Sequence, residues 1–464
     1  MKPEFQPRLP VAVIGAGPVG LAAAARLVER GVAPLILERG PEVGRSLLAW
    51  GHVRVFSPWS FNIDAAARAL LEPTGWRSPD PAALPTGAEI VRDYLGPLAA
   101  HPAIAPHLVL GARVEGVTRR GLDKLGSAGR RDAPFVLRWR GPDGAAHAVH
   151  ARAVIDASGT WDTPNPIGVD GLPVPGETEA AERIAYGVPD SLGRDRALYA
   201  NRRILVIGAG HSAINVALDL LRLEETARAT RVVWALRSAG LDRLRGGGLD
   251  DRLPERGALG TAAMRAIETG RLTLLAPFAA ERIEAGGRAL AVAGTLNGQP
   301  HAVVVDRIIV ATGFRPDFAM LRELRIALDP AIEAPPALAP LIDPNLHSCG
   351  TVPPHGAAEL AHPEPGFYIV GAKSYGRAPT FLMATGYEQV RSVVARIAGD
   401  HVAAREVHLV LPETGVCNTV PVVAAIGCCG GPAPADADAC CLLDAKAKAA
   451  GRDGCGCGGS RSAD

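Results

Sequence analysis

Cysteine has the most uneven distribution among the residue types that could do chemistry in this chain. The first of eight cysteines is Cys349, and the other seven lie between positions 417 and 457. Six of the seven are closely paired: Cys428 with Cys429, Cys440 with Cys441, and Cys455 with Cys457. Adjacent cysteines do not readily form a relaxed disulfide with each other, because the peptide between them is trans and stiff. Each pair can instead present two thiolates to a soft ion such as trivalent arsenic or mercury, whereas the C-x-x-C spacing usual for zinc is missing.

Residues 405–464, which carry these pairs, are predicted to form a flexible tail. Glycine and proline gather around the cysteines, at Gly430, Gly431, Pro432 and Pro434, and favour a chain without a packed core. We therefore expect the six paired cysteines to capture a soft metal or metalloid. A passive low-complexity tail is the alternative interpretation.

Two residues upstream of the tail are candidates for catalysis. Cys349 lies in the segment His347-Ser348-Cys349-Gly350 and could receive a metalloid or a thiol from the tail. His355 could act as a general acid or base, because the ordinary pKa of histidine lies near neutrality. A surface loop without chemistry is the alternative for both, and it is the simpler interpretation for Cys349.

Glycine spacing near the N-terminus predicts a site for a dinucleotide. An apolar strand at 11–14 leads into Gly15-Ala16-Gly17-Pro18-Val19-Gly20, a helical run to Arg30, and a second strand at 34–37 that ends in Glu38. Gly15 permits the tight turn, Gly17 lets a pyrophosphate approach the backbone, and Gly20 lets helix and strand pack closely. The helix N-terminus attracts phosphate, and Glu38 can bind ribose hydroxyls. Arg39 and Arg45, just beyond, are further candidate ligands.

The same pattern occurs a second time in the middle of the chain. A strand at 203–207 leads into Gly208-Ala209-Gly210-His211-Ser212-Ala213, with Ala213 in the third glycine position. The following strand, 232–236, ends in Arg237 rather than in an acid. An arginine there suits a 2′-phosphate that a carboxylate would repel, which favours NADPH over NADH. A solvated basic loop is the alternative for the arginines beyond this strand.

Further strands indicate how the two units are connected. The strands that end in Asp156-Ala157-Ser158-Gly159 and Ala311-Thr312-Gly313 flank the second unit and predict the two crossings between a split outer domain and an inserted inner one. Segments 112–117, 135–140 and 146–154 read as a β-meander. A late strand that ends in Gly371 and a helix over 380–397 complete the outer domain. The expected domains are 1–170 and 311–404 for the outer one, 171–310 for the inner one, and 405–464 for the tail.

The order of these motifs over residues 8–400 resembles flavoproteins with two dinucleotide-binding domains, among them the flavin-containing monooxygenases and thioredoxin-reductase-like enzymes. The resemblance implies an α/β fold with FAD in a split Rossmann-like domain and NAD(P)H in an inserted one. It also implies flavin contacts at Gly159, Gly313 and Gly371.

Asn62 is a catalytic candidate through this resemblance alone. It lies where flavin-containing monooxygenases carry an active-site asparagine, and an N-cap for the helix expected over 63–71 is the alternative. The body lacks the C-x-x-C of thioredoxin-reductase-like enzymes and the F-x-G-x-x-x-H-x-x-x-W of Baeyer–Villiger monooxygenases. Disulfide reduction by a body dithiol is therefore not expected.

The function expected from these features is an FAD-dependent, NADPH-using oxidoreductase of the monooxygenase-like branch. The whole chain, with its cysteine-rich end, is also similar to bacterial flavoproteins associated with arsenic resistance, so a trivalent arsenical or another soft nucleophile is the expected substrate, with molecular oxygen as co-substrate. A reductase that passes electrons through the tail thiols to a metal(loid) or disulfide is one alternative. A metalloid-sequestering flavoprotein with little turnover is another.

Charge and composition exclude other classes of partner. The 464 residues include 49 basic and 48 acidic side chains, a net charge of +1, and 48% hydrophobic residues. Nucleic acids and anionic membranes need a basic surface, so neither is expected as a partner. No apolar signal segment precedes the first strand, which favours the cytoplasm. A homodimer is compatible with all these features.

Overall fold

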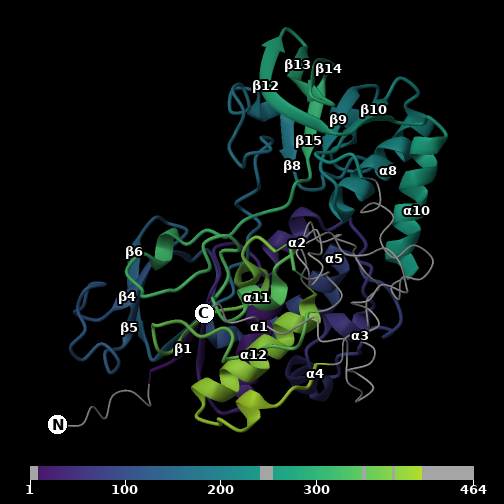
Figure 1. Cartoon of the computed structure of the whole chain (residues 1–464). Helices are drawn as coiled ribbons and strands as arrows, with labels where there is room; N and C mark the ends of the chain where they lie inside the picture. The colour runs from purple at the N-terminus through teal and green to yellow at the C-terminus, as the bar shows by residue number, and fades with distance from the viewer. Residues whose placement is uncertain (1–8, 241–253, 347–351, 379–381, 410–464) are drawn as a thin grey trace, which may run out of the picture.

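The computed structural model describes residues 9–240, 254–346, 352–378 and 382–409 (Figure 1). Cys349 and all seven cysteines of the predicted tail lie outside these residues. The expectations that depend on those thiols therefore stay predictions.

A five-stranded parallel sheet joins the two ends of the described chain. Its order is β16 (Phe367–Ile369), β7 (Ala153–Asp156), β1 (Val11–Ile14), β2 (Pro34–Leu37), β3 (Leu108–Val109). Every residue of β1 and β7 is buried, as expected for strands covered on both faces. Helices α1 (Pro18–Glu29) and α12 (Met383–Ile397) pack together on one face, so the first and last α-helices of the described residues share one core.

A second parallel sheet is formed by the middle of the chain. Its order is β11 (Thr273–Leu275), β10 (Arg231–Ala235), β9 (Arg203–Ile207), β15 (Arg307–Val310), β8 (Ile184–Tyr186). Helices α8 (His211–Thr226) and α10 (Pro254–Glu268) pack against each other beside it. In Figure 1 this unit stands above the first sheet as a separate body.

Each parallel sheet is accompanied by an antiparallel meander. The predicted one consists of β4 (Arg113–Arg119), β5 (Phe135–Arg140) and β6 (Ala146–Ala151). The other, β12 (Phe278–Gly286), β13 (Ala289–Leu296) and β14 (Gln299–Val305), was not expected from the sequence. The turn dipeptides Gly286-Gly287 and Asn297-Gly298 between its alternating strands are the signal that could have revealed it.

Short helices fill the connections around the first sheet. They are α2 (Arg45–Ala49), α3 (Trp59–Asn62), α4 (Ala65–Leu71), α5 (Gly87–Ile90), α6 (Gly96–Ala100) and α11 (Ala339–Ile342), with α7 (Arg196–Tyr199) beside the second sheet. The N-cap of α4 is Asp64, whose carboxylate accepts hydrogen bonds from the backbone N–H groups of Ala66 and Ala67. The alternative that Asn62 caps this helix is therefore wrong, because Asp64 occupies that position.

The predicted fold class is confirmed: two parallel Rossmann-like sheets lie in one α/β chain. Strands of the first sheet precede and follow those of the second along the chain, in the arrangement expected of an insertion. The exact domain boundaries stay predictions. Among the described residues, no helix is both long enough and apolar enough to cross a membrane.

Candidate functional site

A cavity of about 840 Å³ opens at the carboxyl edge of the first sheet. Residues that follow four of its parallel strands line it: Gly15 after β1, Glu38 after β2, Gly159 after β7 and Gly371 after β16. Ligands of open α/β sheets bind outside the carboxyl ends of the strands, so this is the expected place for a dinucleotide.

The three glycines of the first motif have the geometry that a dinucleotide turn needs. Gly15 has a φ of +100°, and a Cβ atom there would lie 2.8 Å from the carbonyl oxygen of Ala157. A Cβ atom on Gly20 would lie 2.0 Å from the carbonyl oxygen of Gly15, so helix α1 can approach β1 only without a side chain. Gly17 instead faces open space at the cavity wall. The turn thus leaves room for a pyrophosphate at the N-terminus of α1.

Glu38 is buried against this turn and lines the cavity. One carboxylate oxygen accepts a hydrogen bond of 2.7 Å from the backbone N–H of Ala16, and the other accepts one of 2.6 Å from Gly40. Each oxygen retains a lone pair that a ribose hydroxyl could use. Glu38 therefore shapes the glycine turn in addition to the ribose-binding role expected for it.

Arg39 and Arg45 also line the cavity, and both form ion pairs with Asp162 on the opposite wall. Burial lowers the pKa of Arg39, and repulsion from Arg45 lowers it further. Two guanidinium groups that share one carboxylate carry a net positive charge. This charge would suit the phosphates of a dinucleotide, and the role of both arginines as ligands stays a prediction.

A buried ion pair that the sequence did not reveal lies in the cavity floor. The Lys373 ammonium donates a hydrogen bond of 2.7 Å to Asp156 and one of 3.1 Å to the Ser158 hydroxyl. The side chains of Lys373 and Asp156 are 2% and 0% exposed. Lys373 lies in the wall beside Gly371 and Ser158, so it brings a fixed cation to the cavity. The sequence signal that could have drawn attention to Lys373 is the rarity of lysine, because only five of the 49 basic residues are lysines.

His355 lies behind the cavity wall instead of in it. It is 4% exposed, and burial lowers its pKa. Its Nε2 atom is 2.9 Å from the amide nitrogen of Gln389, whose oxygen accepts a hydrogen bond of 2.7 Å from the backbone N–H of Gly371. The described residues thus connect His355 to the cavity through Gln389, and its catalytic role stays a prediction.

Asn62 is also buried, at 1% exposure, and is absent from the cavity lining. Its side-chain amide donates hydrogen bonds of 2.7 and 2.9 Å to the carbonyl oxygens of Ser57 and Pro58. Its own backbone carbonyl accepts one of 2.8 Å from the Tyr387 hydroxyl. These contacts hold the loop before α4 in place, and the catalytic role of Asn62 is likewise a prediction.

The second glycine motif repeats the geometry of the first. Gly208 has a φ of +136°, and a Cβ atom there would lie 2.3 Å from the carbonyl oxygen of Ala311, as Gly15 does with Ala157. Gly210 faces open space and precedes α8, whose first residues include Ser212 and the buried Ala213. Arg237 is exposed just beyond β10, and Gly313, with a φ of +88°, follows β15. The second sheet thus offers a second dinucleotide turn with an arginine after its second strand.

The described residues contain no group of three or more His, Cys, Asp or Glu side chains arranged to hold a metal ion. The predicted ligands Cys428, Cys429, Cys440, Cys441, Cys455 and Cys457 lie outside the described part of the chain, as does Cys349.

Comparisons with known proteins agree with this geometry. Residues 13–76 match the model of an NAD(P)-binding Rossmann-like domain. The chain is 26% identical to a ferredoxin–NADP reductase of Thermus thermophilus over 350 residues, which cover 74% of this chain and 84% of that protein. It is also similar in structure to the bacillithiol disulfide reductase of Bacillus cereus, with a TM-score of 0.63, 18% identity, and coverage of 84% and 99% of the two chains. The ornithine N-hydroxylase of Kutzneria matches with a TM-score of 0.55, 16% identity, and coverage of 84% and 100%.

These relatives share one architecture but carry out different reactions. At these identities the solved structures establish the fold. The chain has the fold of flavoproteins with two dinucleotide-binding domains. The prediction of an oxidoreductase that depends on FAD and NAD(P)H is confirmed at that level. None of the three relatives is named for arsenic chemistry.

Proposed function

We propose that this protein is an NADPH-dependent flavoprotein monooxygenase that oxygenates a small soft nucleophile, such as a thiol, a thioether or a trivalent arsenical. The observation that carries the proposal is the cavity at the carboxyl edge of the first sheet, whose described wall combines charged side chains of both signs with the aromatic rings of Trp50, Trp161 and Phe314. Electrons would leave the flavin directly for a small molecule, because residues 1–348, which supply most of the cavity wall, contain no cysteine.

The walls of the cavity support the binding of FAD. The pyrophosphate and ribose of the cofactor suit the glycine turn, Glu38 and the two arginines. Gly159 and Gly371 have no side chains, so the cofactor could approach the backbone closely at these two positions. FAD, when bound, supplies the redox chemistry, and the protein contributes orientation, charge and exclusion of water. Lys373 would stabilise negative charge on whatever lies beside it.

NADPH is the proposed electron donor. Arg237 is exposed just after β10, where dinucleotide-binding domains contact the ribose 2′ substituent. An exposed guanidinium at that place attracts a 2′-phosphate. The name of the Thermus relative also refers to NADP.

Aromatic and sulfur side chains would shield the reaction from water. Trp161 and Phe314 contact each other with ring centroids 4.7 Å apart, and with Trp50 and Met383 they line the cavity. In the proposed reaction NADPH and a proton supply two electrons, one oxygen atom of O₂ goes to the lone pair of the substrate, and the other leaves as water. Excluding bulk water protects the activated oxygen from loss as peroxide.

A reductase is the second candidate. The structural likeness to a bacillithiol disulfide reductase and the sequence likeness to a ferredoxin–NADP reductase favour it. In that case electrons would pass to an external disulfide or carrier, or through the tail thiols to a bound metalloid. A flavoprotein that sequesters a metalloid with little turnover would also be compatible with this fold.

Oxygen consumption distinguishes these proposals. The holoprotein is mixed with NADPH and arsenite or a thioether, and NADPH oxidation, oxygen uptake and peroxide release are recorded together. The monooxygenase proposal expects equal uptake of oxygen and oxidation of NADPH, little peroxide, and an oxygenated product. Undiminished NADPH oxidation with a disulfide under anaerobic conditions would favour the reductase, and no substrate-dependent NADPH oxidation would favour sequestration.

A further inference from the structure

A second pocket, of about 700 Å³, lies at the opposite edge of the first sheet from the dinucleotide cavity. Arg152 immediately precedes β7 and Gly366 immediately precedes β16, so the pocket opens at the amino ends of these strands. Arg396 from the last turn of α12 and His401 just beyond that helix complete one side. Three separate parts of the chain thus bring basic side chains to one place.

Among the residues that the structure describes, none with an acidic side chain lines this pocket. Its polar lining consists of Arg152, His362, Tyr368, Arg396 and His401. The acids closest in sequence are already paired, Glu364 with two arginines and Asp400 with Arg30. The positive charge of the pocket is therefore not neutralised by described neighbours.

The two arginines of the pocket form no ion pair among the described residues. Arg152 reaches only the carbonyl oxygen of Ile397, at 3.4 Å, and Arg396 lies 2.6 Å from the Nδ1 atom of His401. Burial lowers the pKa of Arg152. A guanidinium group has five N–H donors, so both side chains have most of their hydrogen-bonding capacity unused.

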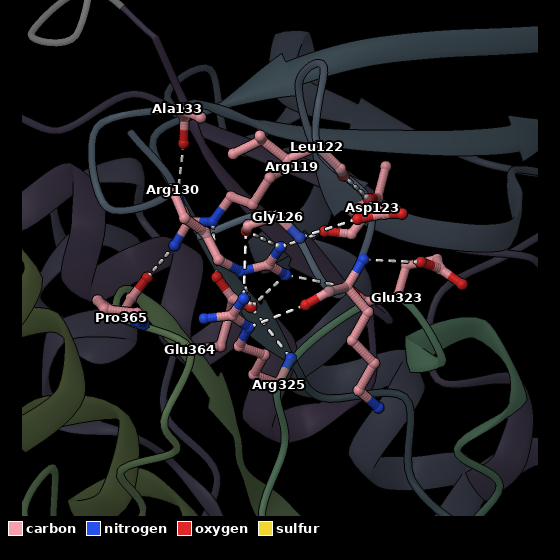
Figure 2. A network of polar contacts seen from close by, with 12 residues as sticks. Arg119, Leu122, Asp123, Gly126, Arg130, Ala133, Glu323, Arg325, Glu364 and Pro365 are labelled. Carbon is pink, nitrogen blue, oxygen red and sulfur yellow. Dashed lines mark hydrogen bonds and ion pairs between the residues drawn. The ribbon is translucent and has the colours of Figure 1, made fainter. Parts of the chain in front are cut away.

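The wall that carries His362 is held rigidly by a buried charge network (Figure 2). Glu364, with a fully buried side chain, accepts hydrogen bonds of 2.8 Å from Arg119, 2.7 Å from Arg130 and 3.0 Å from the backbone N–H of Arg325. Figure 2 shows these side chains converging on Glu364 from different segments of the chain. Residues 361–366 therefore form a fixed wall.

His362 belongs to this wall of the pocket. It is 9% exposed, and its Nε2 atom has no hydrogen-bond partner among the described residues. Its Nδ1 atom lies 3.1 Å from the carbonyl oxygen of Ala327. With Nδ1–H donating to that carbonyl, Nε2 is an enclosed acceptor, so His362 forms part of the wall and is not one of the donors of the pocket.

We propose that this basic pocket binds a phosphoryl group, either inorganic phosphate or a small phosphate ester, at a site separate from both dinucleotide turns. Two guanidinium groups and the Tyr368 hydroxyl offer more donors than the two oxygens of a carboxylate can use, whereas a phosphoryl group presents three oxygens and up to two charges. The rigid wall of residues 361–366 fixes one side of the pocket in advance, which lowers the entropic cost of binding.

Calorimetric titration with inorganic phosphate tests the proposal. The holoprotein is first saturated with FAD and NADP⁺, so that the phosphate positions of both dinucleotide turns are filled, and ionic strength is held constant with chloride. We expect one phosphate per chain. Arg152→Gln and Arg396→Gln should each weaken binding about tenfold or more, because each removes a charge-assisted hydrogen bond.

Arg120→Gln is the matched control, since Arg120 is an exposed arginine outside the pocket. It removes the same charge and should leave phosphate affinity unchanged. Bound FAD per chain and the NADPH oxidation rate verify that every variant is folded, and Arg396→Lys, which keeps the charge, should recover part of the affinity. A parallel titration with glycerol phosphate shows whether the free ion or an ester binds more tightly.

Absence of saturable binding by the wild-type holoprotein to both ligands would overturn the proposal. Equal weakening by all three glutamine variants would also overturn it, because the effect would then reflect net charge alone. Loss of phosphate binding when FAD and NADP⁺ are present would assign the phosphate to the dinucleotide turns.

Discussion

The buried pair between Lys373 and Asp156 supports the sharpest prediction about this protein. We consider the variants Asp156→Asn and Lys373→Met separately and combined. Each single change leaves one charge almost fully buried, because the two side chains are 0% and 2% exposed. The combined change removes both charges and retains much of the side-chain volume.

The expected magnitudes follow from the burial of the pair. Removing one partner of a buried ion pair costs about 3–5 kcal/mol, whereas replacing both by uncharged groups is often close to neutral. Each single variant should therefore lose about 3–5 kcal/mol of unfolding free energy, and the double variant much less than the sum. Arg140→Met, which removes an exposed partner of Glu115, is the control and should leave the unfolding midpoint almost unchanged.

Urea unfolding of the FAD-saturated proteins measures the stability, and the midpoint potential of the bound flavin measures the role in the cavity. Lys373→Met should lower that potential in both the single and the double variant, since the cation would no longer stabilise the reduced cofactor. The reasoning is refuted if the single variants are as stable as the wild type. It is equally refuted if the double variant loses the sum of both single losses.

Three further predictions concern the glycine turn, the nucleotide preference and acid stability. Gly20→Ala should unfold or severely destabilise the first sheet, because its Cβ atom would lie 2.0 Å from the Gly15 carbonyl oxygen. Gly17→Ala, whose Cβ atom would have nothing within 4 Å, should fold but bind FAD weakly. Circular dichroism measures folding and flavin content measures FAD binding, so together they distinguish the two variants. Arg237→Gln should raise KM for NADPH about tenfold with little change in KM for NADH. Arg228→Gln, which changes another exposed arginine, should leave both KM values unchanged. Equal effects of Arg237→Gln on both nucleotides would contradict a contact with the 2′-phosphate. Burial lowers the pKa of His362 to about 4. As the pH falls, the unfolded state therefore takes up the proton before the folded state does. The free energy of unfolding should decrease by about 3 kcal/mol between about pH 6.5 and about pH 4. His362→Gln should remove this loss in urea titrations in phosphate-free buffer, and an unchanged pH profile would exclude His362 as its source.

The local features of the nucleotide turns were predictable because short-range sterics determine them. Gly15 and Gly208 adopt positive φ values beside a neighbouring strand. The strand, turn and helix of each unit follow one another directly in the sequence, so their spacing can be recognised there. The predicted meander followed from alternating strands in the same way. The meander β12–β14 carries a signal of the same local kind, because the turn dipeptides Gly286-Gly287 and Asn297-Gly298 separate its strands.

Other features depended on residues far apart in the chain. Asp156 and Lys373 are separated by 217 positions and meet only because β7 and β16 are neighbours in one sheet. The basic pocket joins Arg152, just before β7, to Arg396 because α12 ends beside the amino end of that strand. Residue type suggested chemistry for His355, and the family resemblance suggested it for Asn62. Packing left both outside the cavity lining, where they bind neighbouring amide and carbonyl groups.

The amino-acid sequence by itself determined the two dinucleotide turns, the arginine after the second one and the uneven distribution of thiols, because each is a property of neighbouring residues and their spacing. The tertiary structure alone decided which side chains face the cavity, that a buried lysine lies in its floor, and that a second basic pocket exists at the far edge of the sheet. Those facts follow from strand order and helix packing, which bring together residues whose separation in the chain carries no signal of contact.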